Sequence, residues 1–170
     1  MESLHADLPY PSLDGIGKDL MAVRIISPAY ADRGSEMTAV LQYVFQAFVF
    51  NSKGMENFAH TLHRIAVSEM THLDILGSLI CKLGALPVFT SCPPRKFDFY
   101  TTAAVSYACE PETMLLCDIR GEKNAIRGYE KMLCKLQSEQ VRAVIARIIE
   151  DEKLHLQALE TMLAELRAAK

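Results

Sequence analysis

The chain contains no tryptophan, no excess of basic residues and no long uninterrupted run of apolar residues. A helix that crosses a bilayer needs ~20 mostly apolar residues in a row, so we expect no membrane partner. A formal net charge of −3 over 170 residues gives no electrostatic attraction for nucleic acid. Residues 1–11 mix acidic and polar residues with prolines and do not resemble a secretion signal. The expected location is therefore cytoplasmic.

The five cysteines lack any pairing pattern. Their number is odd and no two are separated by only two residues, which argues against a disulfide framework and against a zinc or iron–sulfur ribbon. We predict reduced and mostly buried thiols, of which Cys92 and Cys109 are the most exposed. The five are Cys81, Cys92, Cys109, Cys117 and Cys134.

Proline and glycine positions divide the chain into an N-terminal arm and one long helical domain. Residues 1–27 are predicted to hold an irregular arm and a short helix near 18–26. Residues 28–170 form a single domain, large enough to bury a core without disulfides. Proline is tolerated in a first helical turn, so Pro28 is expected to open a helix over 28–51.

Three further helices follow in the predicted domain. The second covers about 55–83, and the prolines within 85–110 exclude a long helix there. The third helix begins at Pro111. It is separated from the fourth only weakly, near 137–140, where Ser138 is the capping candidate. A continuous third and fourth helix, exchanged with a neighbouring chain, is the alternative.

Apolar residues in the four long helices recur at alternating steps of three and four residues, which places them on one face of each helix. Each apolar stripe is interrupted by one glutamate, and in two stripes a histidine follows one turn later. The interrupting residues are Glu36, Glu69, His72, Glu122, Glu152 and His155. We therefore predict an all-α four-helix bundle with four carboxylates in its core.

Carboxylates in such a core need compensation. A buried, unpaired carboxylate costs several kcal/mol, and four of them would rival the ~5–15 kcal/mol stability of a whole domain. No lysine or arginine lies on the four stripes. Two divalent cations would offset about four negative charges, so metal ions are the expected partners of the acids.

The spacing of the acids and histidines indicates how the metals are bound. Glu69 and His72, and likewise Glu152 and His155, are three residues apart, which sets carboxylate and imidazole side by side. Two such pairs, with one glutamate from each remaining helix, match the ligand plan of a dinuclear carboxylate centre. Carboxylate oxygens with two imidazoles favour iron or manganese over tetrahedral zinc. We predict two Fe or two Mn ions.

These motifs resemble those of the ferritin-like superfamily, which includes ferritins, bacterioferritins, rubrerythrins and manganese catalases. The similarity spans roughly residues 29–166, and residues 68–73 most resemble the rubrerythrin and manganese catalase branch. The resemblance implies an antiparallel bundle with a long crossover between its second and third helices. It also implies Glu36 and Glu122 as terminal carboxylates, Glu69 and Glu152 as bridging carboxylates, and His72 and His155 as imidazole ligands.

The sequence departs from these relatives in three ways. Ala125 stands where rubrerythrins usually carry a second third-helix glutamate. The four-cysteine rubredoxin domain of rubrerythrins is missing, and no fifth helix like that of storage ferritins follows the fourth. None of these departures touches the six-residue ligand pattern.

Three more polar residues are candidates for the surroundings of the metals. Tyr43 and Tyr129 each follow a stripe glutamate by seven residues, so the two halves of the chain repeat one pattern. Each is either a core tyrosine with one hydroxyl partner or bonded to a ligand glutamate. The resemblance implies that Asp151 orients the histidine of the opposite helix. A solvated carboxylate is the alternative, and Ser68 holds the equivalent place in the other motif.

The leading functional hypothesis is a redox enzyme that acts on hydrogen peroxide or dioxygen. A peroxidase would need an external electron donor, whereas a catalase would not. Iron oxidation and storage is the competing class and requires a hollow multi-subunit shell. An oxygen-activating enzyme on an organic substrate is a third possibility, which requires an apolar pocket that reaches the metals. By resemblance we expect a homodimer.

Overall fold

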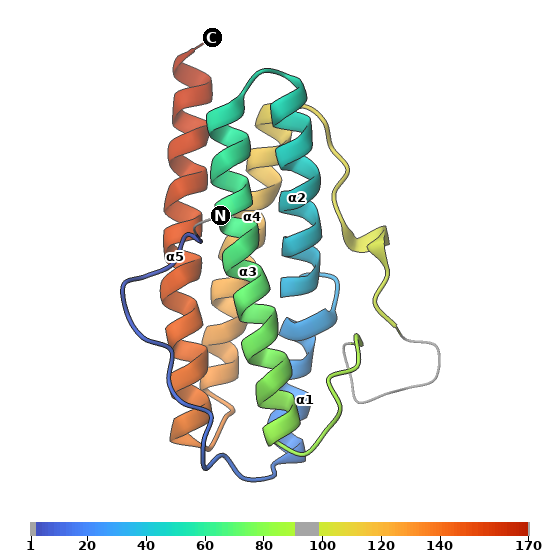
Figure 1. The fold of residues 1–170 in the computed structure, drawn as a ribbon, viewed down its shortest axis with the longest axis vertical. Helices are drawn as coiled ribbons and strands as arrows, with labels where there is room; N and C mark the ends of the chain where they lie inside the picture. The colour runs from blue at the N-terminus through green and yellow to red at the C-terminus, as the bar shows by residue number, and fades with distance from the viewer. Residues whose placement is uncertain (1–2, 91–98, 170) are drawn as a thin grey trace.

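The computed structural model describes residues 3–90 and 99–169, and its architecture is all-α. Four long helices form a bundle, and a shorter helix (Leu20–Ala31) lies below the helix Glu36–Ser52 in the view of Figure 1. The elements are α1 (Leu20–Ala31), α2 (Glu36–Ser52), α3 (Glu56–Lys82), the 3-10 turn η1 (Thr102–Ala104), α4 (Pro111–Leu133) and α5 (Glu139–Ala168).

The bundle consists of two antiparallel hairpins, α2–α3 and α4–α5. Gly54, with a φ of +73°, closes the first hairpin in a conformation that glycine adopts readily. The described parts of the segment between α3 and α4 run back beside α2, so α4 starts at the end of the bundle where α3 also starts (Figure 1). The predicted bundle with a long crossover is confirmed.

The core is made of two apolar clusters with a polar layer between them. The lower cluster packs α1 against the C-terminal half of α3 and the N-terminal half of α5, around Ile26, Leu76 and Ile148. The upper cluster packs the other halves of these helices with α2 and α4, around Phe50 and Leu115. The polar layer is therefore held from both ends by close-packed apolar side chains.

The first two helices differ from the prediction. Pro28 does not open a long helix but lies inside α1, which continues to Ala31. Ala29 and Tyr30 on the far side of the proline are buried in the lower cluster, and this packing outweighs the helical hydrogen bond that proline removes. The chain then turns, and the Ser35 hydroxyl accepts a hydrogen bond from the Thr38 N–H at 3.5 Å. Glu36 is thereby the first residue of α2.

The weakly predicted break between the third and fourth helices is real. α4 ends at Leu133, and the Ser138 hydroxyl caps α5 by accepting from the Val141 N–H at 3.4 Å. The two helices pack against each other within one chain, so the alternative of one continuous helix is wrong.

The prediction of mostly buried thiols is wrong. Cys81, Cys109 and Cys134 are exposed and Cys117 is half-buried. Cys81 lies on α3 away from the stripe that faces the core, Cys109 precedes α4 and Cys134 follows its last residue. Cys92 lies outside the described residues. Within the described part of the chain, no helix is both long and apolar enough to cross a membrane.

We expect Ser35→Ala to lower the free energy of unfolding by about 1 kcal/mol, because it removes the hydroxyl that caps α2. Urea denaturation followed by circular dichroism measures the change. Ser78→Ala, at an exposed position within α3, is the matched control and should leave stability unchanged or slightly raised. Equal losses in both variants would contradict the role of the cap.

Candidate metal centre

The structure brings the six predicted ligand residues together in the polar layer. Each is at most 4 % exposed. Their ligand atoms form two sets, each with all atoms within 4.8 Å of one another, and the sets share Glu69 and Glu152. One set adds Glu36 and His72, and the other adds Glu122 and His155. Two adjacent positions that share two carboxylates are the geometry of a dinuclear centre.

Both histidines turn Nδ1 toward the acids. The Nδ1 of His72 lies 3.1 Å from a Glu69 oxygen, and the Nδ1 of His155 lies 2.9 Å from a Glu152 oxygen. The Nε2 atoms point outward, that of His72 at 3.0 Å from an Asp151 oxygen and that of His155 at 2.9 Å from the Leu4 carbonyl oxygen. Since these outer oxygens accept hydrogen bonds, each Nε2 carries a proton, and Nδ1 is the nitrogen that would bind a metal after losing its own proton.

The two tyrosines cross between the hairpins. The Tyr43 hydroxyl on α2 donates to Glu122 on α4, and the Tyr129 hydroxyl on α4 donates to Glu36 on α2. Each tyrosine therefore fixes the glutamate that the other helix contributes to the centre. Burial, together with the charge of the bonded glutamate, raises the pKa of both tyrosines well above the usual value, so they remain donors.

The charges in this layer are strongly coupled. Burial and the charges of Glu69 and Glu152 raise the pKa of Glu36 and of Glu122 well above the ordinary value. Burial alone would lower the pKa of His72, but Glu152 and the other surrounding acids raise it well above its usual range. Without metal the cluster thus retains protons, and divalent cations would replace them.

Asp151 is the centre of a hydrogen-bond network whose other members the sequence did not reveal. Its carboxylate is fully buried and accepts from the His72 Nε2, from the Tyr10 hydroxyl at 2.5 Å and from the Arg147 guanidinium at 2.7 Å. Although burial favours the neutral acid, these donors hold the pKa of Asp151 well below its usual range. The solvated alternative for Asp151 is therefore wrong. The sequence signal that could have revealed this network is Arg147, which lies four residues before Asp151 and hence on the same face of the helix.

A second buried acid, Asp118, was also missed. It is 1 % exposed and lies one turn before Glu122 on α4. One of its oxygens accepts from Gln42 at 2.7 Å and from Gln46 at 2.9 Å, and the side-chain Oε1 of Gln42 accepts from the Ser106 N–H at 2.8 Å. Burial raises the pKa of Asp118 to about 7, and the two amide hydrogen bonds limit that rise.

A cavity of about 460 Å³ lies between α2 and α4 and reaches all four glutamates of the centre. Its α4 wall includes Gly121 and Gly128, where an added Cβ would meet nothing within 4 Å. Other lining residues are Ala39, Gln42, Cys117, Asp118 and Ala125. The carboxylate side of the centre is therefore open to small molecules.

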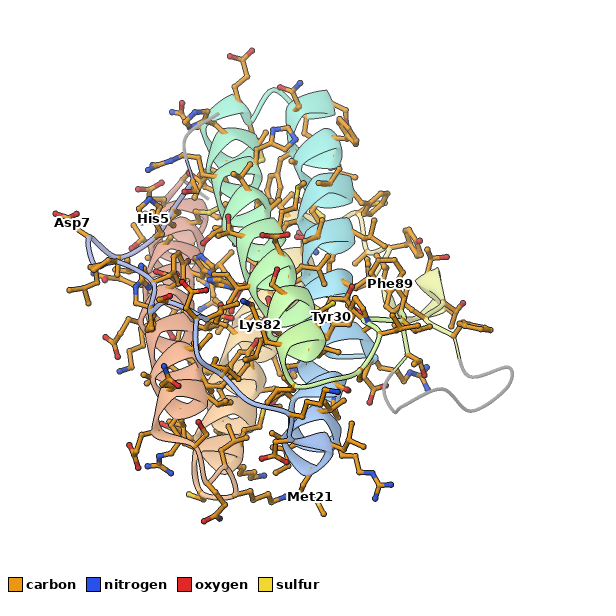
Figure 2. All side chains as sticks on the ribbon, turned by 60° about the horizontal axis from the view of Figure 1, so that its bottom comes forward. His5, Asp7, Met21, Tyr30, Lys82 and Phe89 are labelled. Carbon is orange, nitrogen blue, oxygen red and sulfur yellow. The ribbon has the colours of Figure 1, made fainter. Side chains whose placement is uncertain are left out.

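The histidine side of the centre is covered instead. Figure 2 places His5 and Asp7 of the N-terminal arm beside α5, on the side away from Tyr30 and Phe89. The arm supplies the Leu4 carbonyl to His155 and the Ala6 N–H to Asp151 at 2.6 Å. Small molecules can therefore reach the candidate centre from the carboxylate side, whereas the arm covers the histidine side.

Comparison with known proteins identifies the family of this helical bundle. The sequence matches the family model described as a ferritin-like domain over residues 32–169. The chain therefore belongs to the ferritin-like family. No curated protein sequence matches it.

Two solved structures show a similar fold. A manganese catalase from Anabaena superposes with a TM-score of 0.78 at 20 % identity, over 95 % of this chain and 80 % of the catalase chain. A bacterioferritin from Rhodobacter capsulatus superposes with a TM-score of 0.73 at 21 % identity, over 91 % of this chain and 90 % of the bacterioferritin chain. At these identities the similarity defines the fold alone.

We expect Asp118→Asn to remove a pH dependence of stability. The raised pKa of Asp118, about 7 in the folded protein against ~3.9 in the unfolded chain, means that the folded state holds the proton more tightly. The free energy of unfolding then falls as pH rises from about 4 to 7, by up to ~1.4 kcal/mol per unit, and levels off above that.

Urea denaturation at several pH values, with a chelator present throughout, measures this dependence. Asp118→Asn should match the wild type near pH 4 and exceed it by a few kcal/mol at pH 8. Asp74→Asn, on an exposed part of α3, is the control and should follow the wild-type curve. Parallel curves for Asp118→Asn and the wild type would refute the assignment.

Proposed function

We propose that the chain is a dinuclear iron or manganese oxidoreductase that acts on hydrogen peroxide or dioxygen. The observation that carries this proposal is the pair of ligand sets that share Glu69 and Glu152. Glu69 and Glu152 would be shared by two ions, and such a pair, when bound, would supply two-electron exchange with an oxidant. Glu36 and Glu122 would be the terminal ligands and the two histidines would bind through Nδ1.

The chain's own groups would orient the ligands and manage protons. The tyrosine hydroxyls hold the terminal carboxylates, and the cavity between α2 and α4 admits the oxidant. Reduction of one hydrogen peroxide to two waters consumes two electrons and two protons. Asp118 lines the cavity and holds a proton at its carboxyl group near neutral pH, because its pKa is raised to about 7. It can therefore supply a proton close to the centre.

The electron source separates two versions of this activity. A peroxidase takes both electrons from an external donor. A catalase takes them from a second hydrogen peroxide, which is oxidised to dioxygen and returns two protons. The fold similarity to a manganese catalase favours neither version by itself. Oxygen release from peroxide without added reductant distinguishes them.

We expect two manganese or iron ions per chain and turnover of peroxide by the loaded protein. At a free metal concentration 1,000-fold above its dissociation constant, each bound ion should raise the free energy of unfolding by about 4 kcal/mol. Glu69→Ala should lose at least one ion and all turnover, because Glu69 belongs to both ligand sets. Metal analysis, oxygen-electrode assays and thermal denaturation provide the three readouts.

Asp74→Ala is the control for these assays and should behave as the wild type, because Asp74 is an exposed acid on the same helix as Glu69. Fewer than two ions in the wild-type chain would end the dinuclear proposal. If the chain binds two ions but neither the manganese-loaded nor the iron-loaded protein turns over peroxide or dioxygen, the proposed activity is wrong.

The cavity favours a second candidate, oxidation of an organic substrate by activated dioxygen. A volume of about 460 Å³ is far larger than the ~30 Å³ share of one water molecule in the liquid, so peroxide alone would leave most of it unfilled. Gly121→Leu should fill part of the cavity without a clash at its Cβ. If only peroxide is used, turnover per bound metal should persist. If an organic substrate is used, its binding should be lost.

Iron oxidation for storage is the remaining candidate, and the fold similarity to a bacterioferritin keeps it open. Storage requires a hollow shell of many copies, whereas the expected enzyme is a homodimer. Light scattering of the purified protein separates these by mass. A particle of many subunits with an iron core would replace the enzyme proposal with storage.

A further inference from the structure

The two halves of the metal centre repeat one sequence pattern with a single difference. On α5, Arg147 is followed four residues later by Asp151, then by Glu152 and His155. On α3 the same spacing gives Arg64, Ser68, Glu69 and His72. Serine thus stands where the other half has aspartate, on helices that belong to two similar hairpins.

Within the residues that the structure describes, the α3 half has buried polar atoms without partners where the α5 half has an ion pair. On α5 the Arg147 guanidinium donates to Asp151 at 2.7 Å. On α3 the Arg64 Nε and the Ser68 hydroxyl oxygen are buried and have no hydrogen-bond partner among the described residues. Buried polar groups are rarely left unpaired. In the described part of the chain, the α3 half therefore has two unpaired polar atoms near Ser68, where the α5 half has the Arg147–Asp151 ion pair.

Asp151 shows what that acid would do. It accepts from the outer nitrogen of His72, the histidine of the opposite helix, at 3.0 Å. By the same symmetry an aspartate at position 68 would accept from the outer nitrogen of His155. The serine side chain is shorter and makes no such bond. His155 instead donates to the carbonyl oxygen of Leu4, at 2.9 Å.

The N-terminal arm is fixed firmly enough to fill this role. The Leu4 N–H donates to the Arg64 carbonyl oxygen at 3.2 Å, one turn before Ser68, and the Leu4 side chain packs against the upper apolar cluster. Arg147 donates to the Ala6 and Leu8 carbonyl oxygens at 2.8 and 2.9 Å. Its guanidinium also lies 4.3 Å from the centre of the Tyr10 ring.

We infer that Leu4, Ala6 and Tyr10 of the N-terminal arm support the metal centre, in which the Leu4 carbonyl takes the place of the aspartate absent at position 68. This inference depends on the proposed metal centre. A carboxylate that accepts from the outer nitrogen makes an imidazole a stronger ligand than a neutral carbonyl does. His72 has the carboxylate and His155 the carbonyl, so the two metal positions bind with unequal affinity, and the position with His155 is the weaker.

Titration of the metal-free full-length chain with Mn²⁺, with the free ion followed by electron paramagnetic resonance, tests this directly. The wild-type chain should show two binding steps of different affinity. Leu4→Pro removes the N–H that anchors the carbonyl and should weaken the second step by about 10–100-fold, the usual cost of losing such a partner. The affinity of the first step should change by less than about threefold. General destabilisation would weaken both steps, so a loss confined to the second step is specific to the arm.

Rescue by Ser68→Asp is the sharper test. In the Leu4→Pro background, Ser68→Asp should restore the second step, because the new carboxylate can accept from both His155 and Arg64. Ser68→Leu adds volume without an acceptor and should restore nothing. Asp7→Pro is the matched control for proline in the arm, since its N–H makes no hydrogen bond within the described residues, and it should bind both ions as the wild type does.

The outcomes separate this inference from the proposed function. If the wild-type chain binds no Mn²⁺, the proposed metal centre fails. If it binds two ions and Leu4→Pro binds them with unchanged affinities, only the role of the arm fails. Should Leu4→Pro not fold, Ser68→Asp in the otherwise unaltered chain decides. It must tighten the weaker step by at least about tenfold, and an unchanged step overturns the inference.

Discussion

The mutual repulsion of four carboxylates within one bundle layer is the constraint on which the rest of this structure depends. Each acid is buried, and low-dielectric surroundings make like charges costly. The bundle meets this cost with two histidines, two tyrosine hydroxyls and, in our proposal, two metal ions. Apolar clusters on both sides of the layer provide the packing energy that keeps an otherwise unfavourable arrangement folded.

Residues that lie on the helical stripes could be predicted from the sequence. Glu36 and Glu122 are visible because a charged residue breaks a regular apolar pattern, and the pairing of Glu69 with His72 is visible because three residues make about one turn. The same periodicity fixed the number of long helices. It did not fix the start of α2, since a proline that could open a helix is instead buried within α1. Tertiary packing decided that boundary.

Residues that act from outside the stripes could not be predicted in the same way. Asp118 and Arg147 are polar residues on largely amphipathic helices, where most such side chains are solvated. Their burial follows from how α2 and the arm cover them. The Leu4 carbonyl is harder still, because every residue has a carbonyl group and an irregular arm has no periodicity. The only sequence signal is the absence of aspartate at position 68, because another group must then accept the hydrogen bond from the outer nitrogen of His155.

The wall of the cavity shows that space near the acids is maintained at some cost. Glycine within a helix lowers stability by about 1 kcal/mol relative to alanine, yet α4 has glycine at 121 and 128, where a Cβ would meet nothing within 4 Å. Neither residue is required by close packing or, unlike Gly54, by a positive φ. Open space beside Glu122 is therefore better explained by access to the centre than by the fold.

The arrangement of the helices leaves the candidate centre open on the α2–α4 side and closed on the α3–α5 side. The glutamates contributed singly by α2 and α4 face the cavity, whereas the outer nitrogens of the histidines on α3 and α5 face Asp151 and the arm. A molecule that enters thus meets the carboxylates before it meets the imidazoles. The imidazoles are held by hydrogen bonds and excluded from water. Chemistry at this centre would consequently take place on the α2–α4 side, with the α3–α5 side serving as its fixed support.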